Sequence, residues 1–320
     1  MNTDAEFPIA RKTDRIELGE LAQAFLRQLN GKTLRAYKYD LERFAQWLEL
    51  KDIDHLAREL LADDDHRKAN SIVLRWKNYM NEEGLSSSTL NRRLSSVRSL
   101  VRFAQMLGIV GWQINVPNEK KRGVRDTTGP GRSGMKKLLA ELNSREDSPV
   151  TRRSKALVRL LFDVALRREE VSGIQMEDLD LGNSRLQILG KGRDKKEYVY
   201  IGRDVVTAIL EWTEVREGGD QGALFKSFDP VGKGSGNLTG NSIYRIVKGL
   251  GRSAGVSITP HSLRHGGVTL ALDKTHGDIR RVARFSRHEK LDTVYEYDDR
   301  RKDRDADISN LIGDSLREDD

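Results

Sequence analysis

The chain has 320 residues, with 56 lysines and arginines against 49 aspartates and glutamates, which gives a formal net charge of +7. That length suffices for two ordinary domains, each with its own core, and the charge balance suits a polyanionic partner as well as a solvated basic surface. The sequence has no cysteine, which excludes disulfides, thiolate metal sites and cysteine nucleophiles.

Membrane association is not expected. No run of the sequence approaches the roughly 18 apolar residues that a membrane-spanning helix needs. Residues 1–15 lack the apolar core of a signal peptide, and the lack of cysteine fits a reducing compartment. We therefore expect a cytoplasmic protein without a membrane partner.

The first third of the chain has the apolar spacing of amphipathic helices. Within residues 33–48, apolar side chains recur at steps of three and four from Leu34 to Leu48. Residues 18–29 and 72–79 repeat the pattern more briefly. Together with a fourth helix at 86–108, these predict an N-terminal helical bundle.

The fourth helix and the segment after it are basic. Outside its apolar stripe, the helix carries Arg92, Arg93, Arg98 and Arg102, with no acidic residue among them. A solvated face explains any one arginine, but four together favour contact with DNA phosphates. Residues 113–130 have no helical or strand period and are interpreted as an interdomain linker. This linker adds four cations: Lys120, Lys121, Arg122 and Arg125.

The rest of the chain mixes helices and strands. A helix is expected at 154–166, and residues 178–202 alternate short β-rich runs with Gly, Asn and Asp turns, which predicts a small antiparallel sheet. Residues 228–242 form a Gly-rich loop. Neither Gly-Lys-Gly run, at 190–192 or 232–234, has the spacing of a nucleotide-binding loop.

One short stretch, TPHSLRHGGV at 259–268, raises the question of a metal site or a phosphate site. It places His261 and His265 one helical turn apart, as in zinc hydrolases, but Arg264 and no glutamate lies between them. A guanidinium repels a dication, whereas its fork of donors matches two phosphate oxygens. The pattern therefore predicts a phosphate site without metal. The extra negative charge of a phosphoryl transition state calls for a second arginine, and Arg167 in DVALRREEV can supply it.

Four stretches, in order, resemble the motifs of the tyrosine recombinase (phage integrase) family. ALRREEV is similar to the first conserved box and HSLRH to the second. GDIRRVARFSRHEKLDTVYEY resembles the third, in which a histidine precedes the nucleophilic tyrosine by nine residues. LGKGRDKKEYVYI resembles the hairpin that carries an active lysine. With the helical first part, the similarity covers residues from about 16 to 300.

The resemblance implies a mostly α protein. Its parts are a SAM-like helical core-binding domain that binds DNA (1–112), the basic linker (113–130), an α+β catalytic domain with a small antiparallel sheet (131–300) and a tail helix (301–320). The tail has an apolar stripe that can fold back on its own domain. In the family such a tail commonly docks on a neighbouring protomer, which implies a homo-oligomer, a tetramer on DNA.

The resemblance also implies a role for each matching residue. Arg167 and Arg264 clamp the scissile phosphate, Lys191 protonates the leaving oxygen, His261 and His288 bind the phosphate or assist proton transfer, Glu170 orients the cluster and Tyr297 is the nucleophile. Fixed cations stabilise the tyrosine anion and the developing charge, so neither a metal nor ATP is expected as a cofactor.

Some assignments have competitors. Glu170 could instead pair with a neighbouring base on a helix surface, and Lys195 and Lys196 lie in the same turn as Lys191. Tyr295 is a second tyrosine near the end, but the nine-residue offset from His288 selects Tyr297, and we expect Tyr295 to pack.

The sequence departs from the family pattern at three positions. Ala165 and Arg287 stand where the first and third boxes usually have glycine, and Tyr200 stands where proline is common. No reacting group is lost by these changes.

The resemblance implies a site-specific DNA recombinase that cleaves and rejoins a double-stranded recombination site through a 3′-phosphotyrosine intermediate and a Holliday junction. The alternatives are a type IB topoisomerase-like or hairpin-forming strand transferase, a DNA-binding regulator with a retired active site, and a metal nuclease.

Overall fold

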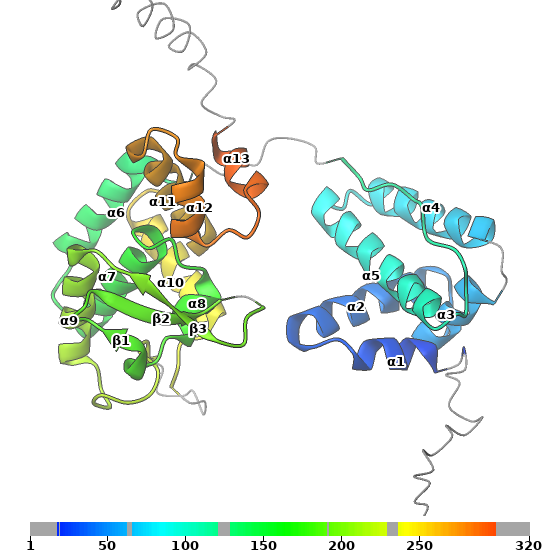
Figure 1. The fold of residues 1–320 in the computed structure, drawn as a ribbon, viewed down its shortest axis with the longest axis horizontal. Coiled ribbons are helices and arrows are strands. Elements are labelled where there is room, and N and C mark those ends of the chain that lie inside the picture. The colour runs from blue at the N-terminus through cyan, green and yellow to red at the C-terminus, as the bar shows by residue number, and fades with distance from the viewer. Residues whose placement is uncertain are drawn as a thin grey trace, which may run out of the picture. The chain divides into compact units, whose positions relative to one another are not determined.

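The computed structural model describes Leu18 and residues 20–62, 66–120, 129–190, 192–228 and 236–298 (Figure 1). The chain divides into two compact units, Met1–Val124 and Arg125–Asp320. None of the helices along these described stretches is long and apolar enough to cross a membrane.

The first unit is a bundle whose described helices are α1 (Leu21–Arg27), α2 (Gly31–Trp47), α3 (Ile53–Leu61), α4 (His66–Glu82) and α5 (Ser87–Met106). Their apolar faces meet in one core, where the rings of Phe44 and Trp76 stack 4.0 Å apart. The predicted helical bundle is confirmed. The sequence analysis did not identify α3, which begins where the Asp52 side chain accepts a hydrogen bond from the His55 N–H at 2.9 Å.

Residues 113–120 pack against this bundle and contribute to its core. Ile114 and Val116 are buried in its core, and the Lys77 ammonium group donates to the Pro117 carbonyl at 3.0 Å. The Asn91 side chain makes two hydrogen bonds to the backbone of Glu119, at 2.7 and 2.9 Å. This part of the expected linker is therefore held by α4 and α5, and residues 121–128 lie outside the described part of the chain.

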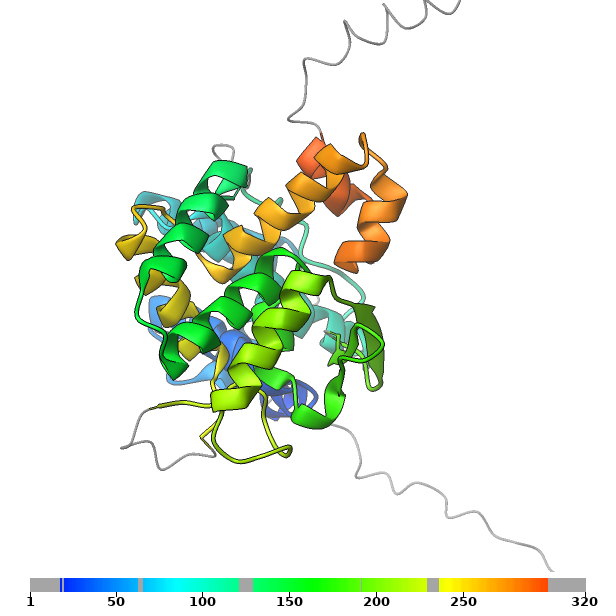
Figure 2. The ribbon, with the colours of Figure 1, turned by 90° about the vertical axis from the view of Figure 1, so that its left-hand side faces the viewer.

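The second unit combines helices with a small sheet. Its helices are α6 (Gly131–Ser144), α7 (Pro149–Phe162), α8 (Arg168–Gly173), α9 (Arg203–Val215), α10 (Gly240–Ser253), α11 (Pro260–Lys274), α12 (Ile279–Ser286) and α13 (Asp292–Asp298), with one 3-10 turn at Met176–Asp178. The buried helix α7 packs against α9 and α11, and Figure 2 shows α9 running alongside it. The predicted α+β arrangement is confirmed.

The sheet contains β1 (Leu179–Asp180), β2 (Arg185–Leu189) and β3 (Lys196–Tyr200), all antiparallel in the order β1-β2-β3. Leu186 pairs with Val199, and both side chains are buried against the core. The side chains of Tyr198 and Tyr200 point to solvent, as the alternation of a half-buried strand requires. The small antiparallel sheet is confirmed.

A sharp turn after α7 positions the site. The predicted helix through residue 166 ends at Phe162, because Ala165 has a left-handed backbone with φ of 51°. Helix α11 crosses this turn closely: a Cβ at Gly267 would overlap the carbonyl oxygen of Phe162, so only glycine fits there. The close crossing brings Arg264, on α11, to the carbonyl of Ala165.

Candidate active site

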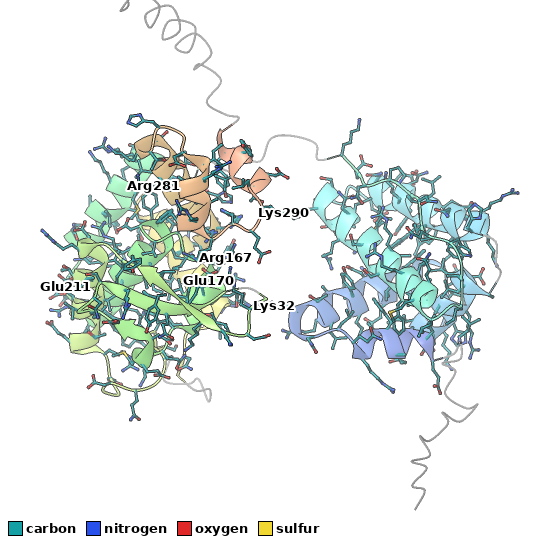
Figure 3. All side chains as sticks on the ribbon, viewed as in Figure 1. Lys32, Arg167, Glu170, Glu211, Arg281 and Lys290 are labelled. Atoms are coloured by element: carbon teal, nitrogen blue, oxygen red, sulfur yellow. The ribbon has the colours of Figure 1, made fainter. Side chains whose placement is uncertain are left out.

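Arg167 lies at the start of α8 and is held by Glu170 on the next turn. The Arg167 backbone N–H donates to Glu170 Oε2 at 2.7 Å, and its Nη1 donates to Oε1 at 2.8 Å. The Glu170 side chain is only 2% exposed, so this is no surface ion pair. Burial raises the pKa of Glu170, but the charge of Arg287 and the donors of Arg167 outweigh it and lower that pKa. The carboxylate stays ionised and fixes the arginine. Figure 3 shows Arg167 and Glu170 side by side.

Arg264 is 2% exposed and is anchored by backbone carbonyls. Its Nη1 donates to the Ala165 carbonyl, and its Nη2 donates to the Ser286 carbonyl at 2.5 Å. Burial, together with the charges of Arg167 and Arg287, lowers the pKa of Arg264 to about 10. The guanidinium therefore remains charged at neutral pH, in a fixed orientation.

His288 contacts Arg264 with one ring nitrogen and Ser286 with the other. The Ser286 hydroxyl donates to the Val282 carbonyl at 2.7 Å, so it must accept from His288 Nδ1, which lies 2.7 Å away. His288 Nε2 is then an acceptor, 3.3 Å from Arg264 Nη2. Burial and the neighbouring cations, Arg264 foremost, lower the pKa of His288 to about 4. The ring is neutral at physiological pH.

Tyr297 is enclosed by histidines. Its side chain is 7% exposed, and its ring lies 4.9 Å from the His265 ring and 6.1 Å from the His288 ring. His265 Nε2 lies 2.6 Å from His261 Nε2, so one of the two carries the shared proton. The sequence analysis gave His265 no role in the reaction, although it lies one helical turn after His261 in the same motif.

Tyr295 was expected to pack, and this was wrong. Its side chain is 48% exposed, whereas Tyr297 two positions later is buried. Positions two apart on a helix face different sides, so α13 can turn only one of the two rings inward.

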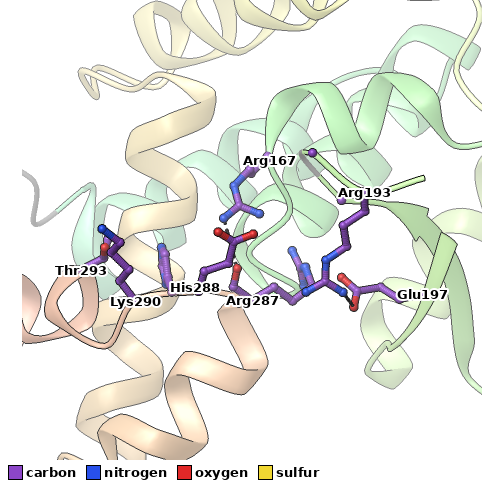
Figure 4. Close-up of a pocket in the computed structure, with 10 residues that line it drawn as sticks. Arg167, Arg193, Glu197, Arg287, His288, Lys290 and Thr293 are labelled. Atoms are coloured by element: carbon purple, nitrogen blue, oxygen red, sulfur yellow. Dashed lines mark hydrogen bonds and ion pairs between the residues drawn. The ribbon is translucent and has the colours of Figure 1, made fainter. Parts of the chain in front are cut away.

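Sequence reasoning also missed two cations that line a cavity of about 580 Å³ beside these residues, Arg193 on the β2–β3 turn and Lys290 before α13 (Figure 4). Arg167, Arg287 and His288 line it as well. Both missed residues fall inside the matching motifs. In the part of the chain that the structure describes, no group of His, Asp and Glu is arranged to hold a metal ion.

Lys191 lies outside the described residues, although its neighbours Gly190 and Gly192 both line the cavity. Of the two competing lysines, Lys196 is turned away, because its ammonium group bonds Asp178 at 2.6 Å. Lys195 is exposed and does not line the cavity.

Three of the arginines predicted to contact DNA, Arg92, Arg93 and Arg98, have partners within the first unit. Arg92 Nη1 lies 2.6 Å from a buried Asp40 carboxylate on α2, and Arg93 lies 3.7 Å from the same carboxylate. Arg98 donates to the Val116 carbonyl and, at 2.8 Å, to Asn118. Arg102 and Lys120 are exposed, whereas Lys121, Arg122 and Arg125 lie outside the described residues.

Comparison with known proteins gives a consistent match. Residues 132–304 match the Phage integrase family, and residues 24–106 match the phage integrase N-terminal SAM-like domain. A tyrosine recombinase of Synechococcus elongatus is 36% identical over 279 residues, which cover 85% of each chain. The tyrosine recombinase XerC of Pseudomonas fluorescens is 28% identical over 276 residues, 85% of this chain and 86% of XerC.

Two solved structures share the fold. The XerH site-specific recombinase bound to a palindromic difH substrate matches with a TM-score of 0.63 and 18% identity, over 92% of this chain and 95% of that one. The Tn1549 transposon integrase in complex with transposon right-end DNA matches with a TM-score of 0.62 and 16% identity, over 91% of this chain and 99% of that one.

Proposed function

The chain belongs to the phage integrase family of tyrosine recombinases, and on that premise we propose that it is a site-specific DNA recombinase acting through a 3′-phosphotyrosine intermediate. The observation that carries this proposal is the enclosure of Tyr297 beside His288, which itself contacts Arg264. A tyrosine hydroxyl has a pKa of about 10 and attacks poorly unless cations stabilise its anion. The buried guanidinium of Arg264, which bonds His288 and remains charged at neutral pH, meets that need.

The scissile phosphate is held by two arginines. Three of the five N–H groups of Arg264 are taken by Ala165, Ser286 and His288, which fixes the plane of the guanidinium. We assign its other two N–H groups, and the 32% exposed side chain of Arg167, to the non-bridging oxygens. These contacts tighten as negative charge grows on the equatorial oxygens in the transition state.

The nucleophile must lose a proton. His288 is a poor acceptor, because its free electron pair already faces Arg264 and the cations oppose a second charge there. The His261–His265 pair is better suited, since the ring of His265 lies next to Tyr297 and His261 is exposed. We therefore assign proton transfer to this pair and phosphate positioning to His288.

Cleavage then exchanges one ester for another. The Tyr297 oxygen bonds to phosphorus, the bond from phosphorus to the 5′ oxygen breaks, and that oxygen receives a proton from Lys191, between the cavity-lining Gly190 and Gly192. A 5′ hydroxyl from the partner duplex reverses the step and releases the tyrosine. Two such exchanges, one strand pair at a time, pass through a Holliday junction. Because the ester is conserved and the cations are fixed, the reaction needs neither ATP nor a metal.

The substrate is a double-stranded recombination site. XerH and the Tn1549 integrase, which share this fold, were solved with DNA. We assign phosphate contacts to Arg102 of the first unit and to the linker cations. We also propose a tetramer on DNA that assembles through the tail at 301–320, which lies outside the described residues.

The experiment that tests the proposal uses nicked duplexes made from the DNA that flanks the protein's own gene, without ATP, in parallel reactions with and without chelator. An SDS-resistant protein–DNA adduct at selected sequences, followed by strand exchange, supports the recombinase. Relaxation of supercoiled DNA at any sequence favours a topoisomerase. Binding without an adduct favours a regulator, and inhibition by chelator favours a metal nuclease.

A further inference from the structure

Arg287, at the end of α12, has a backbone conformation that disfavours side chains. Its φ of 56° and ψ of 46° are left-handed, a region in which glycine is the least costly residue. A side chain there costs roughly 1–2 kcal/mol. Such an outlier points to a compensating contact made by the side chain itself.

The Arg287 side chain turns inward, is 9% exposed and joins two separate segments. Its Nη2 donates to Glu170 Oε2 at 3.0 Å and to the Ala165 carbonyl at 3.2 Å. Its Nη1 donates to the Phe285 carbonyl of its own helix at 3.2 Å. The side chain thus ties the end of α12 to the turn and the helix that begin at Ala165.

Glu170 is the shared partner of two arginines. Oε1 accepts from Arg167 Nη1, and Oε2 accepts from both the Arg167 backbone N–H and Arg287. Without Arg287, a movement of the Arg167 side chain toward a phosphate would take a major countercharge away from the buried Glu170 carboxylate. Such a loss is strongly unfavourable. Arg287 keeps the carboxylate paired and in place when Arg167 engages a substrate.

We propose that Arg287 is a positioning residue of this site: it clamps Glu170 and thereby holds Arg167 against the scissile phosphate, without touching the phosphate itself. The inference rests on the proposed function for what Arg167 binds, but the clamp itself is measurable without DNA. The Arg287 carbonyl also accepts from Arg167 Nη2 at 3.2 Å, and this backbone contact persists in any substitution. Replacing the side chain therefore isolates the clamp.

The first readout is amide hydrogen exchange at Arg167, whose N–H bonds the clamped carboxylate. In Arg287→Gly this amide should exchange about tenfold faster, the effect of weakening one hydrogen bond to a charged group. Arg287→Lys should restore most of the protection. The Leu238 amide, which bonds the Phe225 carbonyl outside α8 and α12, should be unchanged and so exclude a general loss of stability.

The second readout is the rate of adduct formation on the nicked duplexes used above. Arg287→Gly should slow cleavage about tenfold at saturating protein while leaving the DNA dissociation constant unchanged, because the contact acts through Arg167. In a Glu170→Gln background the same substitution should have little further effect. His276→Gly is the matched control, because His276 is exposed and also left-handed, with φ of 52°.

The two failures are distinguishable. If the wild type forms no adduct but the exchange pattern holds, the proposed function fails and the clamp stands. If Arg287→Gly leaves either the cleavage rate or the Arg167 amide at the wild-type value, the inference is overturned. Because glycine relieves the left-handed strain, the Arg287→Gly protein is expected to fold. If it does not fold, Arg287→Lys tests whether a positive charge beside Glu170 is sufficient.

Discussion

His288 Nε2 lies 3.3 Å from Arg264 Nη2, as the acceptor of a hydrogen bond from a group that is charged at neutral pH. A neutral ring is required for this bond, and the lowered pKa of His288, about 4, is its electrostatic counterpart. The pair explains how a histidine can sit within a cluster of arginines. It also ties the stability of the second unit to pH.

The first prediction follows from that pKa. His288 has a pKa of about 4 in the folded protein, against about 6.5 in an unfolded chain, so the unfolded state binds the proton first. The stability that the neutral His288 ring contributes is fully present above pH 6.5 and is lost as the pH falls from 6.5 to 4. After allowance for partial exposure, the loss from pH 7 to pH 5 is about 1–2 kcal/mol. In urea unfolding, the free energy of unfolding should depend more steeply on pH for the wild type than for His288→Gln. Parallel curves for the two proteins would refute the assignment of this effect to His288.

Arg264→Ala tests the phosphate clamp. The cleavage rate should fall by about 10²–10⁴-fold with DNA binding largely retained, because the guanidinium acts mainly in the transition state. The substitution also removes the Arg264 donors to the Ser286 carbonyl and to the Ala165 carbonyl, which keeps its bond from Arg287, and this should cost about 1–3 kcal/mol of stability. Arg168→Ala is the matched control, because Arg168 forms an ion pair with its exposed neighbour Glu169. Equal cleavage rates for the two variants would remove Arg264 from the site.

Gly267→Ala tests the close crossing of α11 and the end of α7. The added methyl group meets the Phe162 carbonyl oxygen, and the helix must shift, which should destabilise the protein by about 1–3 kcal/mol. Gly249→Ala is the control, since it adds a methyl group to α10 with nothing within 4 Å. Thermal unfolding should separate the two. A stable Gly267→Ala protein would mean that the helices do not approach this closely.

The salt dependence of DNA binding tests the basic face of α5. Arg102 is exposed, so Arg102→Ala should lower the slope of log affinity against log salt by about one, the release of one counterion. Arg98 instead holds the segment 113–120. Arg98→Ala should therefore lower the free energy of unfolding more than Arg102→Ala does, and it should lower the slope less. If Arg98→Ala lowered the slope and Arg102→Ala lowered the stability, Arg98 and not Arg102 would be the residue that contacts DNA.

The residues of the site were predictable from their order and spacing, but their partners were not. Sequence placed Arg167, Arg264, His288 and Tyr297 in matching motifs, and the structure brings these four together. Asp40, the partner of Arg92, lies 52 positions away on another helix, so the absence of acidic residues from α5 itself was uninformative. Pairing between helices is set by tertiary packing, which periodicity along one helix does not reveal.

The turn conformations likewise depended on the fold. Ala165 and Arg287 stand where the family has glycine, and both have left-handed backbones, so the turns keep the conformation that glycine favours. Only contacts from distant segments, such as the bond from Arg287 to Glu170, show how a side chain is accommodated there. Helix α3 was missed because its nine residues are fewer than the windows of about 11–18 residues over which helical periodicity is sought.

The most direct test of the central claim is to locate the amino acid that becomes attached to DNA. Tryptic cleavage after Lys290 and Arg300 yields one peptide with both tyrosines, so fragmentation of the nucleotide-bearing peptide must identify the site. The expected result is a nucleotide on Tyr297, an adduct that persists in Tyr295→Phe and no adduct in Tyr297→Phe. A nucleotide on Tyr295, or an adduct that survives in Tyr297→Phe, would contradict the account.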